Sequence, residues 1–395
     1  MNKHILLGIS GGIAAYKSCE LVRLLKKQGH EVSVAMSRAA TEFVSPLTFQ
    51  ALSGNPVLTD THNGESGGNG MAHINLTRAA DVFLIAPASA NTLAKIANGI
   101  ADNLLTNLAA ARKCPLAVAP AMNVEMWFNP ANLRNIAQLR ADGITVFQPA
   151  SGEQACGEVG VGRMPEAAEL ADLLPDLWAP KTLAGKKVLL TTGATFEAID
   201  PVRGLTNISS GQMGVALARA CRAAGAEVSL VYGQLQTALP AGLADVEEAV
   251  SAQEMYDAVH RRVSGQDVFI SVAAVADYKV KSSSAEKLKK SGGEMPLIEL
   301  AENPDILASV AALPEPPFCV GFAAESHNIL EHARAKRLKK GIPMLVANDV
   351  SIAMGKATNQ ITIIDAEGET ALPETGKNEA ANAIVARLAD LLAAH

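Results

Sequence analysis

Apolar and polar positions along the chain follow two periods, and the same order of periods occurs twice. In HILLGISGGIAAYKSCELVRLLKKQGHEVSVAM, residues 4–36, an apolar run leads to a glycine pair, and Leu21, Leu24 and Leu25 then recur at helical spacing before a second apolar run. Residues 186–232 repeat this plan, with a longer insertion between the first apolar run and the helical segment. The pattern predicts strand, helix and strand in both places.

Further apolar runs extend each half. DVFLIAPAS (81–89) and DVFISVAAVADY (267–278) are typical of strands buried on both faces, and LAVAP, ITVFQP, CVGFAAE and MLVAND alternate with helical segments rich in Ala and Leu. We therefore predict an α/β fold with two doubly wound, Rossmann-like domains and mainly parallel sheets. The stretch LPDLWAPKTLAGKK, with two prolines and a glycine, places the boundary near residue 180, which gives domains 1–180 and 181–395.

Composition narrows the class of protein. Nearly half of the 395 residues are apolar and the formal net charge is -6, so an anionic ligand needs a local site rather than a general positive field. No apolar run is long enough to span a bilayer, and the first residues lack the pattern of a signal peptide. We expect a cytoplasmic protein that binds neither nucleic acid nor membrane. Five cysteines without a CxxC pair argue against a disulfide framework or a structural zinc site.

Phosphate-binding candidates occur where predicted strands end. GISGGIAAYK (8–17) places Gly11 and Gly12 between a strand and a helix, but without the GxGxxG spacing of a dinucleotide site. Ser89, Asn91 and Thr92 form a second group of small donors at a strand end. The alternatives are a tight structural turn for the glycines and an ordinary helix N-cap for Ser89.

A histidine and a cysteine lie in glycine-rich segments. His73 follows NGESGGNGMA, where a lone histidine is a candidate catalyst or merely an exposed side chain. Cys156 lies in ASGEQACGEVGVGRM (150–164), which has little apolar content to bury a thiol. Such a segment suits a mobile flap with a reactive or proton-donating thiol, although an incidental loop cysteine is the alternative.

Lysines gather in AEKLKKSGG (285–293) and HARAKRLKKG (332–341). Solvated helix faces would explain such runs, but they bracket NPD (303–305) and GFAAES (321–326). A triphosphate with a divalent cation would need lysines for the phosphates and an acid such as Asp277 or Asp305 for the metal.

Several long motifs in one order carry a resemblance across nearly the whole chain. They are PAMNVEMW, ASGEQACGEVGVGRM, DPVRGLTNISSGQMG, AAVADY, EKLKK, NPDI and KRLKKG. Together they resemble the bifunctional phosphopantothenoylcysteine decarboxylase and phosphopantothenate-cysteine ligase of bacterial coenzyme A synthesis. The resemblance implies an FMN-dependent decarboxylase in the first domain and a CTP-dependent ligase, which forms an acyl-cytidylate, in the second.

For the first domain, the resemblance assigns roles to matching residues. His73 matches the histidine of oxidation and decarboxylation, Asn123 the asparagine that holds the substrate carboxylate, and Cys156 the flap cysteine that donates a proton to the ene-thiol. The implied FMN contacts are Ser10, Gly11, Ser37, Ser89 and Asn91.

For the second domain, Asn207 and Arg203 match residues that position the acyl intermediate, and Lys287 matches the residue that stabilises the transferring phosphate. Mg²⁺ is implied with CTP, and Asp277 is the expected metal ligand. The remaining implied CTP contacts are Ala273, Ala274, Asn303, Pro304, Asp305, Ile306, Phe322, Lys336 and Lys340.

The chain departs from the family pattern at three positions. A proline is expected near Ala194, a basic residue near Phe196 and a lysine at Gln212, which bears on affinity for the substrate phosphate. Two other classes of function stay in competition: a flavin-binding regulatory protein, which would not need His73, Asn123 and Cys156 together, and an NAD-dependent oxidoreductase, which the missing GxGxxG disfavours. The implied partners are 4′-phosphopantothenate, cysteine and CTP, and the implied assembly is a homo-dodecamer.

Overall fold

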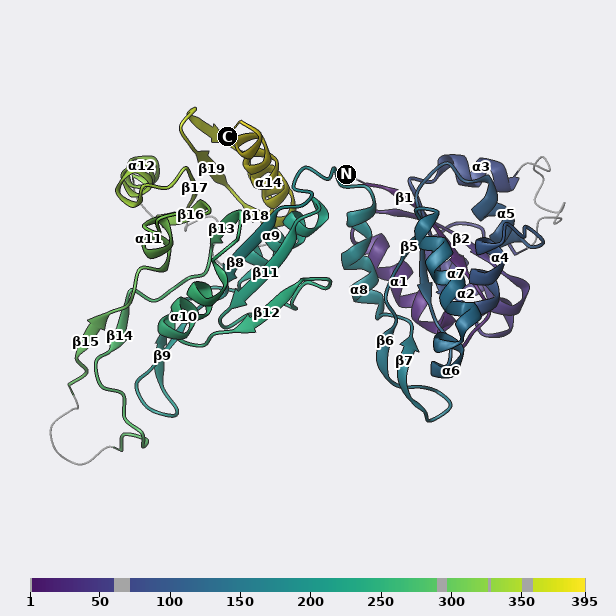
Figure 1. Cartoon of the computed structure of the whole chain (residues 1–395), viewed down its shortest axis with the longest axis horizontal. Helices are drawn as coiled ribbons and strands as arrows, with labels where there is room; N and C mark the ends of the chain where they lie inside the picture. The colour runs from purple at the N-terminus through teal and green to yellow at the C-terminus, as the bar shows by residue number, and fades with distance from the viewer. Residues whose placement is uncertain (1, 60–71, 290–296, 326–327, 350–357, 395) are drawn as a thin grey trace. The chain divides into compact units, whose positions relative to one another are not determined.

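The computed structural model describes residues 2–59, 72–289, 297–325, 328–349 and 358–394, and the chain divides into two compact units, Met1–Trp178 and Ala179–His395. Each unit is an α/β structure built on one main sheet (Figure 1). Among the described residues, no helix combines the length and the apolar character needed to cross a membrane.

The first unit has a five-stranded parallel sheet in the order β2-β1-β3-β4-β5. Its strands are β1 (His4–Ile9), β2 (Glu31–Met36), β3 (Val82–Ala88), β4 (Leu116–Pro120) and β5 (Thr145–Val146), followed by the hairpin β6 (Ala150–Glu153) and β7 (Val159–Arg163). Its helices are α1 (Ala15–Lys27), η1 (Arg38–Glu42), α2 (Pro46–Ser53), α3 (Ala72–Ala79), α4 (Ala90–Ala97), α5 (Leu104–Ala111), α6 (Val124–Phe128), α7 (Pro130–Ala141), α8 (Ala167–Leu173) and η2 (Leu174–Leu177).

Alternation along the strands builds two cores, one on each face of this sheet. Ile5, Leu7 and Ile9 pack with α1, α2 and α8 on one face, while Leu6 packs with α4, α5 and α7 on the other. Because both faces are covered, β1 and β3 are almost continuously apolar, as the sequence pattern predicts.

The second unit has an eight-stranded sheet in the order β12-β11-β8-β13-β16-β17-β19-β20. Its strands are β8 (Lys187–Thr192), β9 (Phe196–Ala198), β10 (Gly204–Thr206), β11 (Glu227–Tyr232), β12 (Asp245–Glu248), β13 (Val268–Ser271), β14 (Tyr278–Val280), β15 (Leu300–Glu302), β16 (Phe318–Glu325), β17 (Met344–Asp349), β18 (Thr358–Asn359), β19 (Ile361–Ile364), β20 (Glu369–Ala371) and β21 (Thr375–Gly376). Its helices are α9 (Gln212–Ala223), α10 (Ala252–Arg262), α11 (Ile306–Ala311), α12 (Ile329–Lys340) and α14 (Lys377–Ala393).

The repeated plan in the sequence corresponds to a repeated topology. The order β2-β1-β3 in the first unit matches β11-β8-β13 in the second, with α1 and α9 as the matching crossover helices. The predicted α/β class with mainly parallel sheets is confirmed. Within the two main sheets, β19 and β20 are the strands that pair antiparallel. Helices α9 and α14 cover one face of that sheet, and α10, α11 and α12 cover the other.

Two segments differ from the simplest interpretation of the sequence. The segment 267–278 continues as a strand only over Val268–Ser271, after which the backbone leaves the sheet. The segment 150–164 is not an irregular loop but an antiparallel hairpin, because Ala150–Glu153 pairs with Val159–Arg163. Strand β14 pairs with β15 in an arm that extends from the second unit (Figure 1).

Candidate active sites

Three serines lie together at the carboxyl edge of the first sheet. Ser10, Ser37 and Ser89 directly follow the neighbouring strands β1, β2 and β3. The Ser10 hydroxyl is buried, donates to the Pro87 carbonyl at 2.8 Å and accepts from the Ser89 N–H at 2.8 Å. Ser10 therefore braces the start of α4 instead of presenting a free hydroxyl.

The glycine pair in this region meets two different demands. A Cβ on Gly11 would lie 2.5 Å from the Ala39 Cβ, so a larger residue could not occupy this position without moving the segment after β2. A Cβ on Gly12 would meet nothing within 4 Å. The backbone beside Gly12 is thus open enough for close approach by a phosphate.

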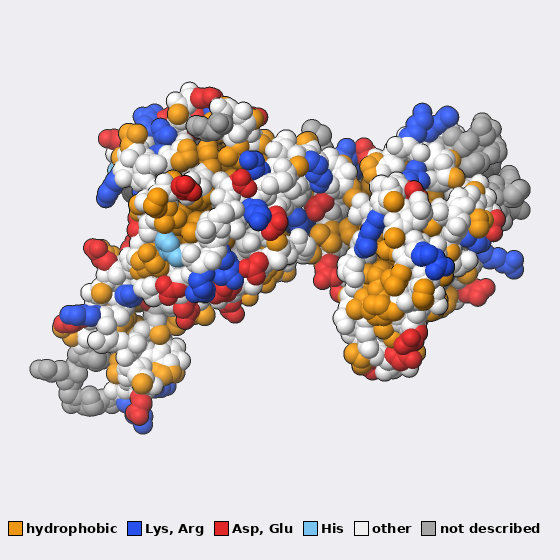
Figure 2. All heavy atoms as spheres, in the orientation of Figure 1, with side chains coloured by type: hydrophobic (Ala, Val, Ile, Leu, Met, Phe, Trp, Pro, Cys, Tyr) orange, Lys and Arg blue, Asp and Glu red, His pale blue; other side chains and the backbone are white. Residues whose placement is uncertain are grey.

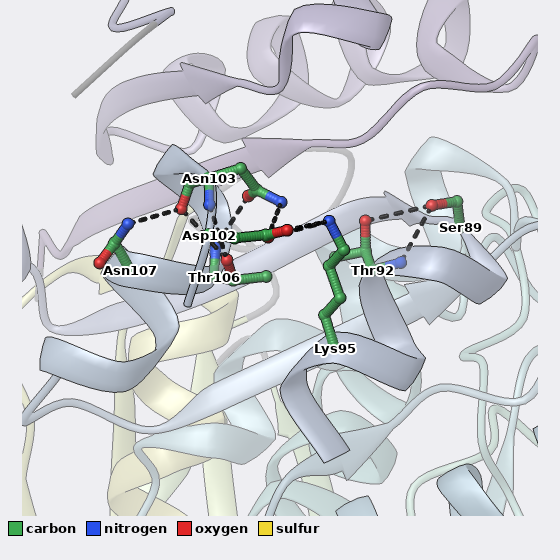
Figure 3. Close-up of polar contacts among 7 residues, drawn as sticks. All are labelled: Ser89, Thr92, Lys95, Asp102, Asn103, Thr106 and Asn107. Atoms are coloured by element: carbon green, nitrogen blue, oxygen red, sulfur yellow. Dashed lines mark hydrogen bonds and ion pairs between the residues drawn. The ribbon is translucent and has the colours of Figure 1, made fainter. Parts of the chain in front are cut away.

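Helix α4 begins at the same edge and is held by a polar network (Figure 3). Ser89 caps the helix by accepting from the Thr92 N–H at 3.3 Å, and one turn later Lys95 pairs with Asp102 at 2.8 Å. Asn103 forms a capping box with Thr106 at the start of α5. Asn91 is exposed in the first turn of α4, so its amide is available to a ligand.

Asn123 is the centre of a second cluster, where β4 leads into α6. Its Oδ1 accepts the Glu125 N–H at 2.8 Å as the helix N-cap, which fixes the amide so that Nδ2 faces the β6–β7 hairpin. That Nδ2 donates to Glu158 Oε2 and lies 3.4 Å from Gln154 Oε1 and 3.5 Å from the Cys156 Sγ. The structure therefore brings the predicted residues Asn123 and Cys156 together.

Backbone contacts seat the hairpin on the end of β4. Gly162 accepts the Met122 N–H at 2.9 Å, and a Cβ on Gly162 would lie 2.2 Å from the Met122 carbonyl oxygen. Gln154 Oε1 also accepts the Val124 N–H at 3.1 Å. Gln154 and Glu158 were not identified from the sequence, where only their place beside Cys156 in a glycine-rich motif could have suggested a role.

His73 lies in helix α3, but its side chain is outside the described part of the molecule, as are residues 60–71 before it. Its relation to Asn123 and Cys156 therefore stays a prediction.

The second unit contains a pocket of about 430 Å³ at the carboxyl ends of β13 and β16. Nine of the residues expected to contact CTP line it: Ala273, Asp277, Asn303, Pro304, Asp305, Ile306, Phe322, Lys336 and Lys340. The sequence did not single out Ser271, Val275, Ala276, Tyr278, Glu302 and Leu307, which also line it. Ala274 is not among the lining residues, and its carbonyl accepts instead from Asn207 at 3.2 Å and from the Thr195 N–H at 3.3 Å.

Charges in this pocket are arranged unevenly. Asp305 caps α11 and pairs with Lys340 at 2.8 Å. Burial alone would raise the pKa of this carboxyl. The hydrogen bonds from Lys340 and the Ala308 N–H outweigh burial, so the pKa of Asp305 is lowered. Asp277 is exposed, and within the described residues its carboxylate has no hydrogen-bond or ion-pair partner. Asp277 is thus better placed than Asp305 to bind a cation.

The side-chain amide of Asn303 gives the pocket a buried polar group. Its Nδ2 donates to the Ala276 carbonyl at 2.9 Å, while its Oδ1 is buried without a hydrogen-bond partner in the described structure. A buried acceptor without a donor is costly, so a ligand hydroxyl or amino group would satisfy it. Lys336 donates to the Phe322 carbonyl at 3.0 Å and thereby fixes a second wall.

Arg203 and Lys287 are not among the residues that line this pocket. Arg203 and Leu288, the chain neighbour of Lys287, both contact Asp200. Arg203 and the backbone N–H groups of Val202 and Leu288 donate to the Asp200 carboxylate, which has no exposed side-chain surface. These hydrogen bonds, led by those from Arg203, lower the pKa of Asp200. Lys287 itself is exposed, and Arg203 also donates to the neighbouring Leu288 carbonyl at 2.8 Å.

Gln212, where a lysine was expected, has a cation beside it. Lys377 at the start of α14 donates to Gln212 Oε1 at 3.2 Å, and burial lowers the pKa of this lysine. A positive charge from a segment distant in sequence therefore lies beside Gln212. Over the residues described, no group of three or more His, Cys, Asp and Glu side chains is placed to hold a metal ion.

Comparisons with known proteins agree with the division of the chain into two units near residue 178. Residues 1–178 match the family model described as Flavoprotein, and residues 183–392 match the DNA/pantothenate metabolism flavoprotein C-terminal domain. The chain is 46% identical over 395 residues to the Coenzyme A biosynthesis bifunctional protein CoaBC of Vibrio parahaemolyticus, with 99% of this chain and 98% of that protein covered. The protein of the same name from Vibrio vulnificus is 48% identical over 95% and 94% of the two chains, and that from Escherichia coli 41% identical over 94% and 93%.

Proposed function

The chain belongs to the family of the coenzyme A biosynthesis bifunctional proteins, so it is an enzyme with ligase and decarboxylase activities, and we propose how its two units divide these reactions. Residues 181–395 join cysteine to 4′-phosphopantothenate at the expense of CTP. Residues 1–180 convert the resulting 4′-phosphopantothenoylcysteine to 4′-phosphopantetheine with FMN as cofactor.

The observation that carries this division is that the described residues of each unit include a polar site. The first site combines an amide donor, Asn123, with a thiol, Cys156, and the same sheet has an open glycine turn after β1. The second is a pocket with two lysines, a free carboxylate and an unpaired buried amide oxygen. The first set suits chemistry on a substrate with a carboxylate, and the second suits a nucleotide triphosphate.

The first unit fits a flavin mononucleotide. The open backbone at Gly12, the close approach at Gly11 and the capped starts of η1 and α4 offer N–H groups to a phosphate, with Ser37, Ser89 and Asn91 around them. Ser10 supports the site by positioning Ser89. When bound, the flavin supplies a two-electron acceptor that oxidises the substrate thiol and later returns the electrons.

The residues of this unit then bind the substrate and move protons. The Asn123 amide holds the substrate carboxylate, because its cap contact leaves only N–H groups facing the site. His73 serves oxidation and decarboxylation, and Cys156 donates the proton that completes reduction of the ene-thiol.

The second unit activates the carboxylate of 4′-phosphopantothenate as an acyl-cytidylate. Lys336 and Lys340 bind the phosphates of CTP, and Asp277 holds Mg²⁺. The buried Oδ1 of Asn303 accepts a hydrogen bond from the nucleotide. Asn207 is positioned by the Ala274 and Val275 carbonyls, at 3.2 and 3.1 Å, to contact the acyl group with Arg203. Lys287 stabilises charge on the transferring phosphate.

We expect the chain to function as a homo-dodecamer. Hydrophobic side chains gather on the visible face of the first unit (Figure 2). The exposed large apolar residues of this unit include Ile13, Tyr16, Leu47 and Val159. Contiguous exposed apolar surface favours association between copies. Native mass spectrometry would test this assembly.

The function is tested by mixing the purified full chain with 4′-phosphopantothenate, cysteine, CTP and Mg²⁺ and identifying the products by mass spectrometry. Formation of 4′-phosphopantetheine, CMP and pyrophosphate is expected. If the reaction stops at 4′-phosphopantothenoylcysteine in protein that retains flavin, the assignment of the first unit is wrong.

A further inference from the structure

The hairpin tip presents two chemical groups to Asn123. The Glu158 carboxylate accepts from Asn123 Nδ2, and the Cys156 Sγ lies 3.5 Å from the same nitrogen. A carboxylate and a thiol side by side are also the two groups at the cysteinyl end of the decarboxylase substrate. The protein thus places its own copy of these groups around the amide that is proposed to bind the substrate carboxylate.

The Asn123 amide has too few hydrogens for all the acceptors around it. Its Oδ1 is committed to the Glu125 N–H, so only the two hydrogens on Nδ2 are available. Glu158 Oε2, Gln154 Oε1 and the Cys156 Sγ already surround them. A substrate carboxylate on Nδ2 must therefore replace one of these acceptors.

Glu158 is the group that electrostatics would displace. Two ionised carboxylates at one neutral amide repel each other, and a cation would be needed to hold both. Within the described residues, Glu158 has no Lys or Arg partner and contacts Asn123 alone through its carboxylate. Gln154, by contrast, is neutral and also anchored to the Val124 N–H.

Resting on the proposed function of the first unit, we propose that Glu158 is a positioning residue that exchanges with the substrate carboxylate on Asn123. The substrate displaces Glu158 when it binds. Loss of CO₂ removes the competing charge, so Glu158 returns to Asn123 and draws the turn that contains Cys156 toward the reacting carbon. Cys156 lies in the same turn, which is closed by the Gln154 N–H to Glu158 carbonyl bond at 2.7 Å.

The test uses the full chain with its flavin and two probes that lack the reactive thiol. One is 4′-phosphopantothenoylserine, which keeps the carboxylate, and the other is 4′-phosphopantothenoyl-ethanolamine, which lacks it. Isothermal titration calorimetry with Glu158→Ala should show the serine probe binding on the order of tenfold tighter than to wild type, because no charge-assisted hydrogen bond has to be broken. The ethanolamine probe should not gain affinity.

Hydrogen exchange of the peptide 153–161 separates displacement from simple charge repulsion. In wild type, the serine probe should speed exchange at the hairpin tip relative to the ethanolamine probe. In Glu158→Ala the tip should exchange faster without ligand and respond equally to both probes. The matched control is Glu153→Ala, which removes an exposed carboxylate from the same hairpin and should behave as wild type.

Three results would overturn the proposal. The first is equal affinity of wild type and Glu158→Ala for the serine probe, and the second is an equal gain in affinity for both probes. The third is a rate of hydrogen exchange at the hairpin tip of wild type that is the same with both probes. Each would show that the substrate carboxylate does not displace Glu158. If neither probe binds wild-type protein that retains flavin, the substrate assignment itself fails, and the proposal fails with it.

Discussion

At the scale of single residues, Gln212 and Lys377 show how a charge can be relocated. The lysine expected at the start of α9 is a glutamine, but Lys377 donates to it from α14 at 3.2 Å. Because cations bind phosphate by charge-assisted hydrogen bonds, Lys377 can serve the phosphate of 4′-phosphopantothenate.

Lys377→Ala should therefore raise the ligase KM for 4′-phosphopantothenate about tenfold and leave the KM for CTP unchanged. Steady-state kinetics of pyrophosphate release measure both constants. The double variant Gln212→Lys with Lys377→Ala should restore the lower KM, and an unaltered KM in the single variant would rule out a role in phosphate binding.

At the scale of elements, the seat of the β6–β7 hairpin depends on Gly162. This residue has φ +152°, and a Cβ there would lie 2.2 Å from the Met122 carbonyl. Gly162→Ala should lift the hairpin from β4, lower the decarboxylation rate about 100-fold by misplacing Cys156, and cost about 1–3 kcal/mol of stability from backbone strain.

Gly157→Ala is the matched control for this variant. Gly157 also has positive φ, +86°, but a Cβ there would meet nothing within 4 Å. Release of CO₂ from supplied 4′-phosphopantothenoylcysteine and thermal unfolding compare the two variants. Equal losses of activity in the two variants would show that backbone strain, and not the contact with Met122, causes the loss in Gly162→Ala.

The second element-scale prediction concerns the segment that contains Lys287. Asp200 joins it to the turn that contains Arg203, through the Leu288 N–H at 3.2 Å, and the Ser284 N–H adds a bond to the Ile199 carbonyl at 2.9 Å. Asp200→Asn should weaken this connection and lower acyl-cytidylate formation about 10- to 100-fold, with decarboxylation of supplied substrate unchanged.

The pH dependence of this effect follows from the lowered pKa of Asp200, whose main cause is hydrogen bonding from Arg203. A carboxyl whose folded-state pKa is depressed stabilises the fold above its unfolded pKa, and this contribution is lost as pH falls through the folded pKa. The ratio of wild-type to Asp200→Asn ligase rates should therefore stay constant between about pH 5 and 8. A decrease of this ratio as the pH is lowered from about 8 to 5 would contradict the role of ionised Asp200 in holding the segment of Lys287.

At the scale of the whole molecule, two sites in two units should be separable by mutation. His73→Asn should abolish CO₂ release and leave pyrophosphate release intact, because His73 belongs to the first unit. Lys287→Gln should do the reverse and lower cytidylate formation on the order of 100-fold by removing charge stabilisation from the transferring phosphate.

Both half-reactions are measured on the same preparations, with retained flavin as the control for folding. Loss of both activities in a folded His73→Asn protein would argue against separate sites, and an unchanged ligase rate in Lys287→Gln would remove that lysine from the mechanism.

The amino-acid sequence by itself determined the elements and their class. Apolar periodicity predicted β1, α1 and β2 and their repeats β8, α9 and β11, because burial of a strand or helix face imposes its own spacing on a local stretch of chain. The long motifs also pointed to Asn123, Cys156 and the residues of the nucleotide pocket, since each motif is contiguous and needs no knowledge of packing.

Only the tertiary structure decided which distant side chains meet. Three hydrogen bonds, Asn123 to Glu158, Lys377 to Gln212 and the Leu288 N–H to Asp200, join segments that are 35, 165 and 88 residues apart. No local pattern encodes such pairs, because each depends on how helices and hairpins pack around a sheet edge. The same packing buries the Ser10 hydroxyl, which was expected to contact FMN. It also pairs two strands within 150–164, which the sequence predicted to be a loop.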